Sequence, residues 1–115
     1  DMAKIGLLYL NKGNWKGEQI IPSGWVEEAS RFHVASCPAG TRREDVKIKP
    51  ASSDWLQGYG YQLWLCRHNA FRADGAHGQF IIILPEKDAV ITVTANNDDM
   101  QEEINLIWKY ILPAL

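Results

Sequence analysis

The sequence predicts an α+β fold in which helices pack on an antiparallel, three-stranded meander. In the second half of the chain, β-rich runs are joined by short turn-like links, which favour antiparallel neighbours. The two ends of the chain instead carry apolar residues at helical spacing. Segregation of helices from strands along a chain is typical of the α+β class.

Length and composition limit the possible architectures and partners. The chain has 115 residues, which is enough for one small domain, so we expect a single domain over residues 1–115. Its apolar content of 46% and charged content of 23% are those of a globular protein. The net charge of −2 gives no electrostatic case for binding nucleic acid or an anionic membrane surface. No apolar run approaches the roughly 20 residues of a membrane span.

A helix is predicted at the N-terminus, over residues 1–10, and the Asn11-Lys12-Gly13 sequence ends it. The chain starts within this helical pattern, without an initiator Met or signal peptide, so we expect it to be cut from a longer protein whose compartment the sequence does not reveal. The apolar stripe of the helix is formed by Met2, Ile5 and Tyr9, with Leu8 beside it.

A second helix is predicted to begin at Pro22-Ser23-Gly24, with Ser23 as its N-cap. After it, periodicity disappears over residues 33–57, which we expect to form a long, variable loop. The apolar face of this helix is formed by Trp25, Val26, Ala29 and Phe32.

The predicted sheet occupies the second half of the chain. Tyr59–Cys66 alternates between apolar and polar residues, and Ala89–Ala95 is rich in β-branched residues. Between them, Gln79–Leu84 is either a separate strand or a continuation of Phe71–Gly75 past the glycines. A last helix, Asp98–Leu112, is expected to pack on the sheet. Asp98 and Gln101 would form its capping box, and Met100, Ile104, Ile107, Trp108 and Ile111 its buried stripe.

Motifs of known chemistry are scarce. The sequence contains no S-x-x-K, no G-x-S-x-G, no P-loop and no cysteines at zinc spacing. The three histidines are scattered, so neither a metal site nor a cofactor is expected. Cys37 and Cys66 could form one disulfide, and the sequence leaves their pairing open.

Gly75 and Gly78 bracket His77 within a strand-like run. Glycine inside a strand marks either a β-bulge or a close approach of a ligand to the backbone, and the two interpretations are compatible. A lone histidine at such a place is more often structural than catalytic, so His77 alone does not establish a site.

Three stretches resemble the serine β-lactamase-like family, which includes class C β-lactamases, D-alanyl-D-alanine carboxypeptidases, family VIII esterases and 6-aminohexanoate-dimer hydrolases. The first runs from Asp1 to Val26 and includes Gly13-Asn14-Trp15-Lys16-Gly17 and Ile20-Ile21-Pro22. The second is Tyr59-Gly60-Tyr61 with Trp64, and the third runs from Asp74 to Lys87. The resemblance covers most of the chain and leaves out the long loop.

The resemblance implies an active-site wall. The family's K-T-G or H-T-G triplet falls on Ala73-Asp74-Gly75, where only the glycine matches. This departure argues against a β-lactamase or carboxypeptidase and favours the esterase or amide-hydrolase branch. Ala76 would then supply a backbone N–H to the oxyanion hole, and His77 would donate a hydrogen bond or carry a proton. The remaining residues implied to contact substrate are Asp74, Gly75, Gly78 and Tyr59.

By this resemblance, the chain is the C-terminal part of a serine hydrolase that cleaves a small ester, amide or lactam through an acyl-enzyme. Alone it should be inactive, because the family's S-x-x-K is absent from it and the family's Y-x-N loop is expected upstream; the string Tyr9-Leu10-Asn11 lies at the end of the predicted N-terminal helix. The alternative is a non-catalytic α+β binding or assembly module that keeps the scaffold. We also expect the isolated chain to self-associate, by pairing of its last strand or by burial of exposed tryptophans. The candidate tryptophans are Trp15, Trp25, Trp55 and Trp64.

Overall fold

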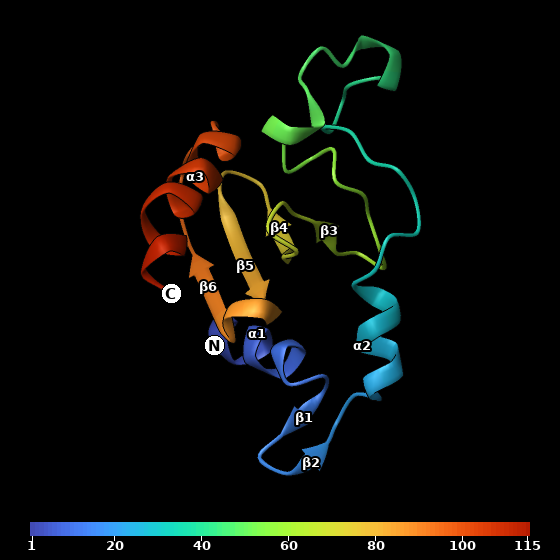
Figure 1. The fold of residues 1–115 in the computed structure, drawn as a ribbon, viewed down its shortest axis with the longest axis vertical. Helices are drawn as coiled ribbons and strands as arrows, with labels where there is room; N and C mark the ends of the chain where they lie inside the picture. Colours follow the sequence, from blue (N-terminus) through green and yellow to red (C-terminus); the bar gives the residue numbers. More distant parts are fainter.

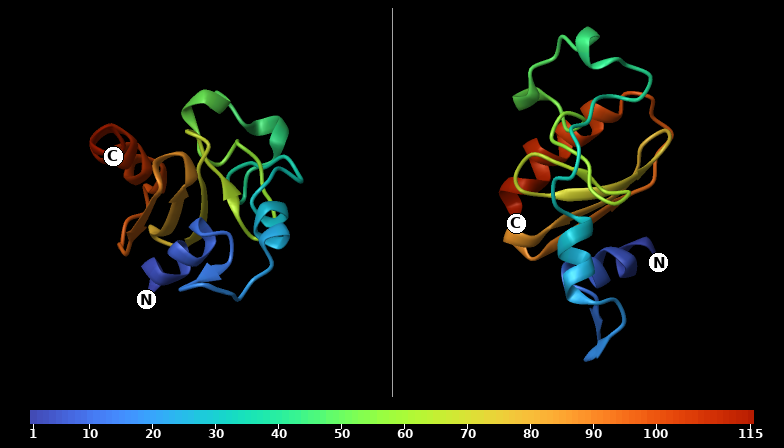
Figure 2. Two further views of the ribbon diagram at one scale, coloured as in Figure 1. Left: turned by 60° about the horizontal axis from the view of Figure 1, so that its bottom comes forward. Right: turned by 90° about the vertical axis from the view of Figure 1, so that its right-hand side faces the viewer.

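A computed structural model describes all residues, 1–115, and contains one four-stranded antiparallel sheet with a helix on each face (Figure 1). The strands lie in the order β3-β4-β5-β6, each antiparallel to the next. The first half supplies one of these two helices, a further helix and a small hairpin (Figure 2). The bounds are α1 Met2–Leu10, β1 Asn14–Trp15, β2 Glu18–Gln19, α2 Ser23–Ala29, β3 Trp64–Leu65, β4 Phe71–Gly75, β5 Gln79–Leu84, β6 Ala89–Val93 and α3 Met100–Leu106.

The α+β class and its antiparallel sheet are confirmed, but the count of three strands was wrong. Residues 71–75 and 79–84 are two strands, because the residues between them form a turn rather than a bulge. The predicted strand over Tyr59–Cys66 is reduced to Trp64–Leu65. Gly60 explains the difference: a Cβ there would lie 2.0 Å from the Ala29 carbonyl oxygen. The chain then bends at Tyr61 and Gln62, and the Tyr61 backbone N–H donates to the Ala29 carbonyl oxygen at the end of α2.

Helix α1 covers the β5–β6 face of the sheet through a residue that the sequence pattern did not indicate. Gly6 is its only fully buried residue, and a Cβ added there would meet Val90 at 2.4 Å. Ile5 was expected on the buried stripe and is instead 52% exposed. The glycine brings the helix backbone against the sheet, while Met2, Leu8 and Tyr9 of the expected stripe are half-buried.

Helix α3 packs on the opposite face of the sheet, against the strand β5. Ile104, Ile107 and Trp108 are buried there with Phe80 and Ile82 of β5. The helix continues as a π-helical turn over Ile107–Ile111 and a 3-10 turn over Leu112–Ala114. Two details of the prediction were wrong. Ile111 is exposed, and the N-cap is Asp99, whose side chain accepts from the Glu102 backbone N–H.

Helix α2 leaves part of its apolar face in solvent. Its N-cap is Pro22, so Ser23 is the first helical residue and not the cap. Val26 and Ala29 are buried, whereas Trp25 and Phe32 were expected on the same face and are 50% and 57% exposed. The long loop after it contains only two 3-10 turns, Arg43–Asp45 and Pro50–Ser52. No helix has both the length and the apolar character needed to cross a bilayer.

Candidate functional site

Ala76, His77 and Gly78 form the turn that joins β4 to β5; we call these three residues the β4–β5 turn. Gly75 pairs with Gln79, so the turn lies beyond the last pair of the ladder. His77 and Gly78 have φ angles of 66° and 91°, in the left-handed region. Glycine takes this conformation freely, whereas histidine needs support from its surroundings.

Ala76 is an exposed residue, and its backbone N–H forms no hydrogen bond within the chain. It follows directly on Gly75, the last residue of a central strand, so the sheet fixes its position. A fixed and unpaired N–H is able to receive a developing oxyanion, because its role depends on position and not on a side chain.

His77 is held through both its backbone and its ring. Its carbonyl oxygen accepts a hydrogen bond of 2.9 Å from the Asn97 backbone N–H. Its ring Nδ1 lies 2.8 Å from Asp98 Oδ1. Both partners come from the segment between β6 and α3, so the end of the sheet and the start of the helix meet at the turn.

Gly78 is the buried member of the turn and lies against helix α3. A Cβ at this position would meet a Glu103 carboxylate oxygen at 2.1 Å. Both Glu103 carboxylate oxygens are buried without a hydrogen-bond partner, and burial raises the pKa of this carboxyl group. Any side chain at position 78 would therefore displace Glu103 as well as strain the backbone.

Asp74 lies on β4 and is engaged by a buried arginine that sequence reasoning missed. Arg72 Nε donates to Asp74 Oδ2 at 3.1 Å, and the arginine side chain is fully buried. The guanidinium carbon lies 4.3 Å from the Trp55 ring centroid and 5.4 Å from that of Trp64. Burial raises the pKa of Asp74, and the Arg72 charge only partly offsets this effect. The sequence did contain a signal, because Arg72 is a charged residue between two apolar residues of a predicted strand. A charged side chain that is buried needs a partner.

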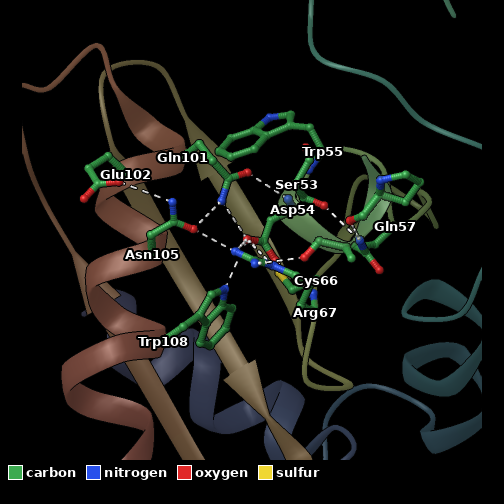
Figure 3. Close-up of polar contacts among 12 residues, drawn as sticks. Ser53, Asp54, Trp55, Gln57, Cys66, Arg67, Gln101, Glu102, Asn105 and Trp108 are labelled. Atoms are coloured by element: carbon green, nitrogen blue, oxygen red, sulfur yellow. Dashed lines mark hydrogen bonds and ion pairs between the residues drawn. The ribbon is translucent and has the colours of Figure 1, made fainter. Parts of the chain in front are cut away.

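A second buried carboxylate, Asp54, fastens the long loop to the rest of the molecule (Figure 3). Its side chain accepts hydrogen bonds from Arg67, Gln101 and Trp108. Burial alone would raise the pKa of Asp54, but these donors outweigh it and lower the pKa. The carboxylate is thus ionised and satisfied, and sequence reasoning missed it because it lies in a stretch without periodicity.

The structure brings together most, but not all, of the predicted site residues. The β4–β5 turn and its flanking strand ends hold Asp74, Gly75, Ala76, His77 and Gly78 in sequence. Tyr59 lies elsewhere: it bridges to Val34 and Trp64, and its ring packs edge-on against Trp64. No group of three potential ligands is placed to hold a metal ion, and Cys37 and Cys66 are both free thiols.

A cavity of about 390 Å³ lies between the long loop and the start of α3. Its walls are apolar at Ile48, Trp55 and Met100. Asp98, which contacts His77, is also on its lining. The side chain of Asp98 therefore connects the cavity to His77 of the β4–β5 turn.

Comparisons with known proteins agree on one group of hydrolases, although no family model matches the chain. Over 94 residues it is 30% identical to the 6-aminohexanoate-dimer hydrolase of Paenarthrobacter ureafaciens, a match that covers 79% of this chain and 22% of that protein. Its structure is similar to a "Putative 6-aminohexanoate-dimer hydrolase from Bacillus anthracis", with a TM-score of 0.62 and 28% identity over 99% of this chain and 27% of that one. The chain spans about a quarter of the length of these relatives.

Proposed function

We propose that this chain, which is related to the serine β-lactamase-related hydrolases, is the C-terminal part of such an enzyme and forms one wall of its active site. The complete enzyme would hydrolyse an ester, amide or lactam through an acyl-enzyme. The observation that carries the proposal is the unpaired N–H of Ala76, an exposed residue directly after a central strand. An N–H so placed matches the oxyanion donor that the family resemblance assigns to this residue.

The surroundings of Asp74 favour an ester or amide substrate over one anchored by its carboxylate. The family's cation is replaced by Ala73, and the negative charge of Asp74 is already paired with Arg72. A substrate carboxylate at this point would meet a second carboxylate and no free cation. Both relatives carry the name 6-aminohexanoate-dimer hydrolase, and two amino acids are ordinarily joined through an amide, which supports the amide among these substrates.

Gly75 and the cavity provide the room that such a substrate requires. Gly75 leaves the backbone beside Ala76 without a side chain, whereas the space at Gly78 is taken by Glu103. The cavity of about 390 Å³ is within the size range of small-molecule sites, and its apolar walls suit an aliphatic chain. Tyr59 would contact substrate only on a separate part of the same wall, next to Trp64.

Comparing the isolated chain with the complete protein tests the proposal. The reading frame that encodes the chain should contain S-x-x-K and Y-x-N before position 1. The complete protein should hydrolyse p-nitrophenyl acetate and a linear aliphatic amide, and residues 1–115 alone should not exceed denatured protein, because the nucleophile and base are absent. Replacing the S-x-x-K serine by alanine provides the matched control.

Two results would overturn the proposal. Turnover by residues 1–115 alone would show that the chemistry does not depend on a missing nucleophile. A complete reading frame without S-x-x-K would instead favour the alternative, a non-catalytic binding or assembly module on the same scaffold.

A further inference from the structure

Asp98 determines which nitrogen of His77 carries the proton. Asp98 Oδ1 lies 2.8 Å from His77 Nδ1, and an ionised carboxylate can only accept a hydrogen bond. A neutral imidazole has one N–H, which must therefore be on Nδ1. His77 Nε2 is then unprotonated. It has no hydrogen-bond partner in the chain, and the side chain is 62% exposed.

The backbone of His77 is fixed independently of its ring. The Asn97 N–H donates to the His77 carbonyl oxygen, and Gly78 is enclosed by Glu103. Two contacts thus hold the turn itself, while Asp98 holds the imidazole. Only the contact with Asp98 restrains the ring itself, because the other two act on the backbone.

We propose that Asp98 is a positioning residue for His77, and that it makes Nε2 a hydrogen-bond acceptor next to the N–H of Ala76. This inference rests on the proposed function. The donor at Ala76 and the acceptor at His77 then belong to consecutive residues of one turn. A substrate carbonyl oxygen can bind the first while an O–H or N–H, of water or of the substrate, binds the second.

A purely structural role is a poor explanation for the pair. The side chains of His77 and Asp98 are 62% and 92% exposed, and ion pairs this exposed add little to stability. The backbone bond from Asn97 also remains when the carboxylate is removed. Replacement of Asp98 should therefore leave the fold intact and change only which nitrogen of the His77 imidazole carries the proton.

The tautomer can be measured directly in residues 1–115 by long-range ¹H–¹⁵N NMR of the imidazole nitrogens, at a pH where the rings are neutral. We expect His77 to be protonated on Nδ1 in the unmodified chain and to change to the Nε2–H form, which free imidazole favours, in Asp98→Ala. Glu18→Ala removes the same charge from an exposed residue without an ion pair and should change nothing. His68 forms no hydrogen bond and serves as the internal reference for the Nε2–H form.

An Nε2–H signal from His77 in the unmodified chain would overturn the inference, and so would an Nδ1–H signal that persists in Asp98→Ala. This outcome is separate from that of the activity assay. The complete protein can lack turnover while His77 shows the expected tautomer, and the tautomer can be wrong in an active enzyme.

Discussion

Trp108 Nε1 donates a hydrogen bond of 3.1 Å to Asp54 Oδ2 in the interior of the molecule. This bond joins helix α3 to the long loop, which contributes few other buried side chains. The same carboxylate receives bonds from Arg67, whose guanidinium also reaches Asn105 on the helix. One buried anion therefore holds the loop, the β3–β4 connection and α3 in a fixed arrangement (Figure 3).

Removal of this carboxylate should be strongly destabilising. Asp54→Ala leaves the Trp108 N–H and the buried part of Arg67 without their acceptor, and we expect a loss of about 3 kcal/mol in the free energy of unfolding. Urea denaturation of the unmodified chain and of Asp54→Ala measures this loss. Asp45→Ala, which breaks an exposed ion pair with Arg42, is the control and should change stability by no more than about 0.5 kcal/mol. Equal effects of the two substitutions would contradict a structural role for Asp54.

Asp54 should also contribute to unfolding by acid. Because its pKa is lower in the folded chain than the ordinary value of 3.8, its stabilisation is complete above that value and is lost as the pH falls through the folded pKa. Asp74 and Glu103 have raised pKa values and act in the opposite direction. The difference in unfolding free energy between the unmodified chain and Asp54→Asn isolates the effect of Asp54. It should be constant above about pH 5 and shrink as the pH falls below about 4; a difference that stays unchanged down to about pH 2 would count against the lowered pKa.

The stripe on α3 can be tested with two isoleucines on the same helical segment. Ile107 is 4% exposed and Ile111 is 41% exposed. Ile107→Asp buries a charge without a partner and should cost about 3 kcal/mol of stability. Ile111→Asp places the same charge in solvent and should stay within about 0.5 kcal/mol. Thermal unfolding distinguishes the two, and similar melting temperatures would mean that the helix does not dock as described.

The sequence predicted elements where periodicity is strong and failed where a single residue decides the packing. The α3 stripe could be predicted because Ile104 and Ile107 follow the helical repeat. The orientation of α1 could not, because Gly6 carries no hydrophobic signal and acts only through the close approach that it permits. The close approach of Gly60 to the Ala29 carbonyl oxygen could not be predicted either. It is possible because Gly60 has no Cβ, and the lack of a side chain leaves no hydrophobic pattern in either segment.

The candidate site was predictable only in its local part. Ala76 and His77 adjoin glycines in one run, so the resemblance and the glycine pattern both indicated them. Asp98 was assigned to a helix cap because it precedes an apolar stripe, and only the fold shows it beside His77. The Asp54 carboxylate is satisfied by partners distant in sequence, and Arg72 Nη1 donates to the Asp54 carbonyl oxygen 18 residues away; no spacing rule identifies such contacts.

The two free thiols should differ sharply in reactivity. Cys66 is buried, and burial raises the pKa of its thiol to about 11, so almost no thiolate is present at neutral pH. Cys37 is half-buried, and its S–H donates to the Thr41 carbonyl oxygen at 3.1 Å. We expect 5,5′-dithiobis(2-nitrobenzoic acid) to modify only Cys37 in the folded chain and both thiols in urea. Cys37→Ser should be unreactive when folded; prompt modification of Cys66 in that variant would contradict its burial.

Self-association of the isolated chain remains a prediction, and the structure narrows the surfaces that could support it. Strand β6 is an edge of the sheet, with Thr92 exposed on it, so its outer backbone groups can pair with a second copy. Among the tryptophans, Trp25 is 50% exposed. Trp55 and Trp64 are half-buried and pack on the buried Arg72, and this contact makes them poor anchors for a second copy.

Sedimentation at high micromolar concentration should therefore show a dimer, since symmetric pairing is the most common way for a chain to bury such a surface. Thr92→Lys adds a charge to the open edge and should shift the population toward monomer by disfavouring pairing there. Ser52→Lys adds the same charge to an exposed part of the long loop and should leave the dimer unchanged. If Thr92→Lys still forms dimers and Trp25→Ser does not, the helix α2 surface is the interface. A monomer in the unmodified chain would show that α1, α3 and the long loop already cover the sheet sufficiently.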